Sequence, residues 1–435
     1  MTRRDPKAMP VPTLRRPRLR SEGSGLSLLA AAILWAVPLL LFFGRFRTGA
    51  GTRPKTPGET AASREAARAN EAAALSNLPY ILQARDPRAD RKGVVVDEKG
   101  RVSPGLNFLL PWSIERPGRA YLLDEDGRIV WRWSLESSLA GRKPRQWVGH
   151  FELLPDGSVV AVIHDDSIVE LDRDSRIRWR TAIRAHHDVW RDPSGDLYAL
   201  ARRAELVPEI HPSRPIESDS IVVLSAEGKV KREISIIGLL RRSGYGYLLP
   251  RLQDAGVPRS GPAIDVFHTN HVETFDGRLA KRSPLFAKGN LLISIRNRNA
   301  IAIVDPRVEK IVWLWGPGNL AYQHDPRLLP NGHILVFDNG VERSQVVEID
   351  PLTMRVAWRY APGSEFFSRV VGAVQRLPNG NTLMTDSVKG RAAEVTPGGE
   401  IVWEYLNPEF SGKGLRNGIL RMTRFPRDTL TFLPK

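Results

Sequence analysis

The chain of 435 residues contains no cysteine. This absence excludes disulfides, zinc–thiolate sites, iron–sulfur clusters and cysteine nucleophiles together, and it leaves histidine as the main candidate nucleophile. Long hydrophobic runs are also scarce. Only one stretch is apolar enough to cross a bilayer, which excludes a polytopic transporter. The hydrophobic fraction of 42% excludes wholesale disorder.

Acidic residues are outnumbered, but the excess of positive charge is unevenly distributed. Lys and Arg total 64 against 48 Asp and Glu, a formal net charge of +16. Residues 1–58 alone carry eleven basic and two acidic side chains, which leaves only +7 for the remaining 377 residues. Because this charge lies beside the apolar stretch, it favours a role in orienting a membrane segment. Nucleic-acid binding is the least favoured function.

The apolar stretch is the uncharged run at residues 23–44, whose 22 residues match the length of a membrane-spanning helix. Seven Lys or Arg precede it and two directly follow it, which predicts a cytoplasmic tail at residues 1–22. A cleavable signal peptide is the alternative, but its apolar core is usually shorter. We therefore expect an uncleaved signal anchor in the cell inner membrane, with the rest of the chain on the periplasmic or extracellular side.

Residues 45–105 are predicted to form a linker between this anchor and the folded region. Residues 46–58 are rich in Gly, Pro and Thr, and the following segment at 60–76 is rich in Ala, Glu and Arg. The latter composition predicts a short helix, closed by Asn77-Leu-Pro79. A spacer that lifts the folded region away from the membrane is the favoured interpretation.

From residue 106 to residue 435 the chain is a repeat with a period of about 45 residues. Each copy has an apolar strand, a Pro-x-Gly turn, a second strand, a third strand rich in Val and Ile, and a fourth strand that carries Trp. Four strands per repeat of this length predict an all-β fold, a six-bladed β-propeller. The recurring Trp position falls at Trp131, Trp179, Lys231, Trp313, Trp358 and Trp403.

Two histidines recur at the same place in different blades. His187 and His324 each lie six residues before the proline of the turn, on the strand expected to line the central channel. His150 is one step out of phase, so strand alternation turns it to the other face. A structural role satisfied by the backbone is the alternative for any single histidine. A three-histidine metal site ranks second, because Asp188 and Asp325 are expected to point away from their neighbouring histidines.

Several ordered motifs resemble the bacterial-type, nucleotide-independent arylsulfotransferases and their propeller relatives. The resemblance runs from about residue 119 to 405 and is densest from 264 to 387. The motifs that carry it are Phe267-His268-Thr-Asn270, Ser294-x-Arg296-Asn297, Gln323-His324-Asp325, Phe337-Asp338-Asn339-Gly340 and Gln375-Arg-Leu-Pro-Asn-Gly-Asn381.

The resemblance implies a six-bladed propeller that moves a sulfuryl group from an aryl sulfate ester to a phenolic acceptor through a sulfated histidine. It assigns the nucleophile to His324 and supporting catalytic roles to His268, Arg296 and His187. Neutral imidazole is a nucleophile, and Arg and His donors stabilise the developing charge. No cofactor and no metal are expected. The candidate substrate-binding residues are Asn270, His271, Asn297 and His186.

Other functions remain open at this stage. A non-catalytic propeller that binds a partner at the membrane surface is the main alternative, because a fold does not determine a function. A quinone-dependent dehydrogenase is weaker, since no acidic cluster for calcium and no vicinal Cys pair is present. The sequence also leaves open which of His186 and His187, and which of His268 and His271, faces the site. Donor, acceptor and oligomeric state are not identified.

Overall fold

The protein is represented by a computed structural model, which describes residues 83–112, 118–135, 147–253, 263–363, 366–411 and 414–434. The tail 1–22, the membrane segment 23–44 and the helix near 60–76 that the sequence predicts lie outside these residues. Within the described ranges, no helix combines the length and the apolar character needed to span a membrane.

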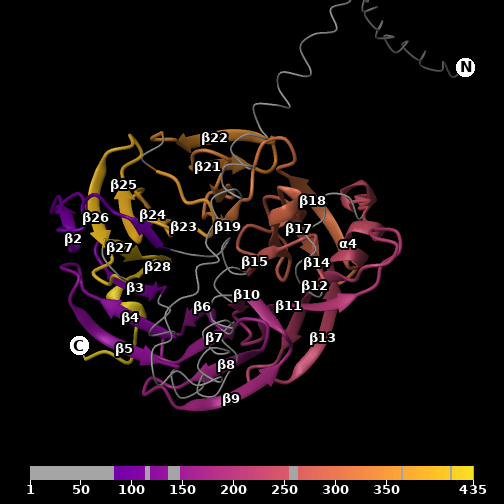
Figure 1. Ribbon diagram of the computed structural model, residues 1–435, viewed down its shortest axis with the longest axis horizontal. Coiled ribbons are helices and arrows are strands. Elements are labelled where there is room, and N and C mark those ends of the chain that lie inside the picture. The colour runs from indigo at the N-terminus through magenta and orange to yellow at the C-terminus, as the bar shows by residue number, and fades with distance from the viewer. Residues whose placement is uncertain are drawn as a thin grey trace, which may run out of the picture. The chain divides into compact units, whose positions relative to one another are not determined.

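Six sheets surround a central channel, and this arrangement confirms the all-β, six-bladed β-propeller (Figure 1). Within each blade the strands run antiparallel from the channel outward. Blade 1 consists of β28 (Ile419–Phe425), β3 (Leu106–Pro111), β4 (Arg119–Leu123) and β5 (Ile129–Ser134). Blade 2 consists of β6 (Val148–Leu153), β7 (Val159–Ile163), β8 (Ser167–Leu171) and β9 (Ile177–Ala182). Blade 3 consists of β10 (Ala185–Arg191), β11 (Leu197–Glu205), β12 (Ile216–Leu224) and β13 (Val230–Ser235), with β14 (Ile264–Asp265) beside β12.

The second half of the ring follows the same plan. Blade 4 consists of β15 (Thr269–Thr274), β16 (Leu291–Ile295), β17 (Ala300–Asp305) and β18 (Lys310–Trp315). Blade 5 consists of β19 (His324–Leu328), β20 (Ile334–Asp338), β21 (Gln345–Asp350) and β22 (Arg355–Tyr360). Blade 6 consists of β23 (Ala373–Arg376), β24 (Thr382–Asp386), β25 (Arg391–Val395) and β26 (Ile401–Leu406), with β2 (Gly93–Asp97) as an outer fifth strand.

Strands near the two ends of the described chain pair with each other at two places, and these pairings close the ring of blades. The C-terminal strand β28 is the innermost strand of blade 1, where it pairs with β3 near the N-terminus. The strand β2, near the start of the described chain, pairs with β26 at the rim of blade 6. A small third pairing joins β1 (Gln83–Arg85) to β27 (Leu415–Asn417). The sheet region therefore begins at residue 83, inside the segment 45–105 that the sequence predicts as a linker.

Burial follows the position of each strand within its blade. The middle strands β7, β8, β16 and β20 are buried along their whole length, because both of their faces pack against neighbouring blades. The outer strand β9, in contrast, has only exposed and half-buried residues. The recurring Trp position lies on the fourth strand of each blade, counted from the channel, and Trp403 is only 1% exposed. The tryptophans therefore cover the edges of the core between blades.

The irregular spacing of the repeat reflects insertions around blade 4. Between β13 and β15 lie the helix α4 (Ile236–Arg242), the short helix η2 (Gly246–Leu248) and β14. Ser235 caps α4 by accepting a hydrogen bond from the backbone N–H of Gly238. A second insertion between β15 and β16 contains η3 (Pro284–Phe286), and η4 (Arg296–Arg298) directly follows β16; η5 (Arg427–Thr429) follows β28.

Candidate active site

A small cavity lies at the end of the channel where the inner strands begin. Its volume is about 50 Å³, and its walls include five of the residues singled out in the sequence: His187 of β10, His268 just before β15, Asn270 of β15, Arg296 of η4 and His324 of β19. These residues come from three consecutive blades. The structure thus brings all four predicted catalytic residues to one cavity, and it selects His187 over His186 and His268 over His271 as the cavity-lining member of each pair.

Irregular backbone at the starts of the inner strands aims these side chains. Pairing in β10, β15 and β19 shifts register near the first residues of each strand. His187, His268 and Asp325 adopt left-handed conformations with φ of 56°, 50° and 50°. Such conformations are uncommon for non-glycine residues and are maintained by surrounding contacts. The bulges re-aim side chains that simple alternation along a strand would place elsewhere.

The imidazole of His324 is held in one tautomer by Asn339. The Nδ2 amide of Asn339 donates to the carbonyl oxygens of Ser368 at 2.7 Å and Val371 at 2.5 Å, which fixes which end of the amide is nitrogen. Its Oδ1 therefore faces Nδ1 of His324, at 2.7 Å, as an acceptor. The proton of a neutral His324 ring then sits on Nδ1, and the lone pair is on Nε2.

The surroundings of His324 favour its neutral form. Burial and the nearby positive charge of Arg296 lower the pKa of His324 to about 3, although the hydrogen bond to Asn339 acts in the opposite direction. The ring is therefore uncharged near neutral pH, with its single proton on Nδ1. An uncharged imidazole with its lone pair on Nε2 is the form that can act as a nucleophile.

His268 pairs with a carboxylate that the sequence analysis did not single out. Nδ1 of His268 contacts Oδ2 of Asp265. Burial alone would raise the pKa of Asp265, but the neighbouring His268 and Arg202 outweigh it and hold that pKa below its ordinary value. A carboxylate at Nδ1 fixes the ring and leaves Nε2 as the position for proton exchange. The His268 ring lies against that of His187, with centroids 4.5 Å apart.

Arg296 is positioned from both sides. Its Nη1 donates to Oδ1 of Asn297 at 2.8 Å, and its guanidinium lies over the ring of Tyr322 at 4.8 Å. Asn297 in turn donates from Nδ2 to the backbone carbonyl of Asp265 at 3.1 Å. Asn297 does not line the cavity, so the geometry gives this predicted substrate-binding residue a supporting place behind Arg296.

Aromatic side chains form the wall next to His187. The indole of Trp147 lines the cavity and stacks on His164, with ring centroids 4.6 Å apart, and His164 meets the edge of His187 at 5.4 Å. Nδ1 of His186 lies 2.8 Å from Nδ1 of His187, and His186 itself is buried outside the cavity. The structure thus places His164 in the layer that supports His187.

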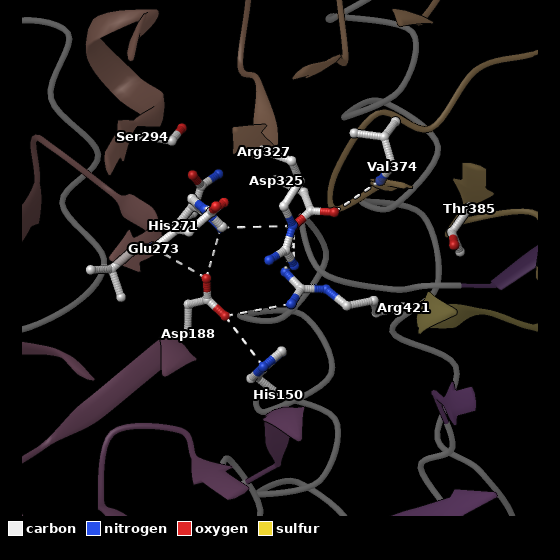
Figure 2. Close-up of polar contacts among 12 residues, drawn as sticks. His150, Asp188, His271, Glu273, Ser294, Asp325, Arg327, Val374, Thr385 and Arg421 are labelled. Atoms are coloured by element: carbon white, nitrogen blue, oxygen red, sulfur yellow. Dashed lines mark hydrogen bonds and ion pairs between the residues drawn. The ribbon is translucent and has the colours of Figure 1, made fainter. Parts of the chain in front are cut away.

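A charged cluster fills the channel beneath the cavity (Figure 2). Asp188 of β10 and Asp325 of β19 lie near Arg421 of β28, with Nη2 of Arg421 2.9 Å from Oδ1 of Asp325. His271 of β15 is fully buried in this cluster, and its Nδ1 lies 2.8 Å from Oδ2 of Asp188. The predicted substrate-binding residue His271 therefore belongs to the charged cluster and not to the cavity wall.

The ionisation of this cluster follows from its contacts. Burial would raise the pKa of Asp188 and Asp325, but nearby His and Arg side chains hold both values below the ordinary one. Burial would lower the pKa of His271, whereas Asp188 and Glu273 raise it above its ordinary value. Among the described residues, no group of three or more His, Asp or Glu side chains has an arrangement that could hold a metal ion.

A second, larger cavity of about 620 Å³ lies on the other side of the cluster, where the inner strands end. Trp190, Glu273 and Arg327 are among the residues that line it, and the guanidinium of Arg327 lies over the ring of Trp190 at 5.2 Å. His150 and Arg421 line both cavities. The charged cluster therefore separates the two ends of the channel.

Several residues of the site carried no recognisable role in the sequence. Asn339 and Asp325 stand inside motifs, but Asn339 meets His324 from the next strand of the same blade, and Asp325 meets Arg421 and Val374 from other blades. Trp147 and Arg421 fall outside every motif. The signal that could have identified Asn339 is its place in the Phe-Asp-Asn-Gly segment directly after a buried strand, where a polar side chain reaches the end of the channel.

The Arylsulfotransferase (ASST) family matches residues 150–408, more than half of the chain. No curated protein matches the chain. Similar solved structures include a protein of unknown function from Bacteroides caccae, at 14% identity over 70% of this chain and 94% of that one, with a TM-score of 0.45. They also include a streptogramin B lyase, at 12% identity over 79% and 96%, with a TM-score of 0.44. A third is virginiamycin B lyase from Staphylococcus aureus, at 12% identity over 64% and 84%, with a TM-score of 0.37.

These structural likenesses are too distant to argue for a function. The family match, in contrast, spans the blades that supply His187, His268, Arg296 and His324. The chain therefore belongs to the arylsulfotransferase (ASST) family.

Proposed function

We propose that this protein transfers a sulfuryl group from an aryl sulfate ester to a phenolic acceptor through a sulfated His324. The observation that carries the proposal is one cavity that brings together the neutral, tautomer-fixed imidazole of His324, the guanidinium of Arg296 and the imidazoles of His187 and His268. Each of these groups has a role that the chemistry requires.

In the first half-reaction, Nε2 of His324 attacks the sulfur of the donor. An N–S bond forms while the bond between sulfur and the aryl oxygen breaks. His268 enters this step protonated on both ring nitrogens, with Nδ1–H facing Asp265, and the departing oxygen takes the proton from its Nε2 and leaves as a phenol. Arg296 and His187 stabilise the negative charge on the sulfuryl oxygens and on the leaving oxygen. Nδ1 of the sulfated ring keeps its proton opposite Asn339, so the ring bears positive charge and is a good leaving group.

In the second half-reaction, the hydroxyl oxygen of the acceptor attacks the same sulfur. The S–N bond breaks and restores neutral His324. His268 takes the proton that the acceptor loses, which returns it to its starting form, while Asp265 keeps the ring in place. One binding site thus serves donor and acceptor in turn.

The size of the cavity suits a sulfuryl group. About 50 Å³ holds roughly three to five water-sized groups, which is room for the sulfuryl oxygens and not for an aromatic ring as well. The aryl group of either substrate would then extend outside this volume, on the side where Trp147, Val370 and Leu420 form the apolar wall. This placement favours substrates with a flat aromatic ring.

The proposal includes a place in the cell. The apolar run 23–44 would anchor the chain in the inner membrane, and the preceding basic tail would keep the N-terminus in the cytoplasm. The propeller would then work on the periplasmic or extracellular side. Protease digestion of intact spheroplasts tests this topology, because an externally placed propeller is degraded and a cytoplasmic one is protected.

The activity is tested with the full-length protein in detergent, a chromogenic aryl sulfate as donor and a simple phenol as acceptor. Wild type and His333→Ala should both catalyse transfer, because His333 lies away from the cavity in contact with Glu348. His324→Ala should lose it. If wild type and His324→Ala behave alike, or if wild type binds the aryl sulfate without transferring it, the protein is a binding propeller and not a transferase.

A further inference from the structure

The two aspartates of the charged cluster have the same position and the same kind of hydrogen bond in two different blades. Each directly follows a histidine that lines the small cavity, Asp188 after His187 and Asp325 after His324. Each also accepts a hydrogen bond from the backbone N–H of the next blade's inner strand. Asp188 Oδ2 accepts from Val272 at 3.2 Å, and Asp325 Oδ2 accepts from Val374 at 2.9 Å. Both carboxylates therefore fix the backbone beside a cavity histidine to a neighbouring blade.

Arg421 joins the two aspartates across the channel. It lies on β28, the closing strand of blade 1, and its Nη1 is 3.6 Å from Oδ1 of Asp188 while its Nη2 is 2.9 Å from Oδ1 of Asp325. Figure 2 shows this guanidinium between the two carboxylates. Arg327 also contacts Asp325 at 2.8 Å, but among the contacts of these two arginines only those of Arg421 reach both aspartates.

The position of Arg421 gives these contacts a consequence for the site. Its side chain is 17% exposed and lines the cavity, yet both terminal nitrogens face carboxylates. The two aspartates have less than 4% exposure and are ionised, so they need a cation to balance their charge. A planar guanidinium can face two carboxylates at once, whereas an ammonium group is a single point charge.

We propose that Arg421 is a positioning residue for sulfuryl transfer, which holds Asp188 and Asp325 together and thereby fixes the backbone of His187 and His324. This inference rests on the proposed function for its kinetic consequence. It also gives the closing strand a role beyond stability, because the strand completes the site from outside the family match at residues 150–408.

The test compares Arg421→Gln and Arg421→Lys with Arg424→Gln in the full-length protein. Arg424 is the matched control: it is a buried arginine of the same strand, it contacts the carboxylate of Glu394, and it does not line the small cavity. For Arg421→Gln we expect kcat to fall about 10- to 100-fold, because a displacement of about 1 Å at the reacting groups slows the reaction by a factor of this size. The donor KM should change less than about 3-fold. Arg421→Lys should recover part of the loss, and Arg424→Gln should keep kcat within about 2-fold of wild type.

Two kinetic results would overturn the positioning role. If Arg421→Gln raised the donor KM at least 10-fold with kcat unchanged, Arg421 would contact the substrate instead. If Arg421→Gln and Arg424→Gln lowered kcat equally, the effect would reflect a general loss of stability. Arg421→Lys keeps the test valid if the glutamine variant fails to fold, because a lysine variant with full wild-type kcat would also contradict the role.

A second readout separates this inference from the proposed function. Modification of His324 by diethyl pyrocarbonate, followed by peptide mass mapping, needs no sulfuryl transfer. The rate at His324 should change at least about 3-fold in Arg421→Gln and stay unchanged in Arg424→Gln, with His333 as the internal reference. If wild type transfers no sulfuryl group but this pattern holds, the proposed function fails and the positioning role stands. If transfer occurs and the His324 rate is the same in all variants, only the positioning role fails.

Discussion

The hydrogen bond between Asn339 and His324 offers a quantitative test of how the nucleophile is prepared. In Asn339→Ala, the protein loses two hydrogen bonds to the carbonyls of Ser368 and Val371 and one to Nδ1 of His324. At about 1 kcal/mol net for each bond, the free energy of unfolding should fall by about 3 kcal/mol. Urea unfolding measures this loss.

The kinetic effect should be separable from the loss of stability. Without its acceptor at Nδ1, the His324 ring is no longer biased toward the tautomer that keeps the lone pair on Nε2. A bias of about 1 to 1.5 kcal/mol corresponds to a roughly 5- to 12-fold slower sulfation step. A pre-steady-state burst of phenol release, measured with a chromogenic donor and no acceptor, reports that step directly.

Asn407→Ala is the matched control, because its amide makes the same set of contacts elsewhere. Nδ2 of Asn407 donates to the carbonyls of Asn417 and Gly418, at 2.9 and 3.0 Å, and Oδ1 accepts from the N–H of Glu409 at 3.1 Å. Asn407→Ala should lose a similar amount of stability and keep the burst rate. An equal slowing of the burst in both variants, or no slowing in Asn339→Ala, would refute the role assigned to Asn339.

Three further predictions concern ionisation, the second histidine and the backbone. Because the folded pKa of His324, about 3, lies below its ordinary value of 6.5, the unfolded chain binds more protons between these values. The contribution of His324 to stability, at most about 5 kcal/mol, is therefore complete above pH 6.5 and is lost as the pH falls toward 3. Urea unfolding at several pH values should show that the free energy of unfolding of His324→Gln falls less with decreasing pH than that of wild type. Parallel curves of this free energy against pH would contradict the prediction. Asp265→Asn should lower kcat about 10- to 100-fold by releasing the ring of His268, and unchanged steady-state transfer would argue against a proton-exchange role. Gly372→Ala should cost at least about 2 kcal/mol, because φ is +127° and the new Cβ would lie 2.5 Å from the ring of Phe337; a variant as stable as wild type in thermal unfolding would show that the strain is absent.

The repeat predicted most of the fold because each blade carries its own local signals. Turns, alternating apolar residues and the Trp position recur within about 45 residues, so they are visible in one sequence. The strand pairing that closes the ring of blades was not visible in the sequence. The strand β28 pairs with β3, more than 300 residues away, and neither segment carries a signal for the other. The short apolar run of β2 likewise lay within a segment of linker-like composition.

The site shows the same division between local and distant information. The spacing to the turn proline placed His187 and His324 at the same end of the channel, and the structure puts both on one cavity. What the spacing could not show is which side chains from other strands and other blades meet them. The contact of Asn339 with His324 depends on a turn between neighbouring strands, and that of Arg421 with Asp325 depends on ring closure. Strand alternation also failed near the bulges, where left-handed residues change the direction of the side chains.

Formation of sulfated His324 is the step on which the proposed mechanism depends. The full-length protein is mixed with an aryl sulfate in the absence of acceptor, and its intact mass and tryptic peptides are measured under conditions that preserve a sulfur–nitrogen bond. The account predicts a gain equal to one SO₃ group, located on His324, absent from His324→Ala and discharged by adding a phenol. No gain in mass despite active transfer, or an adduct on another residue, would contradict it.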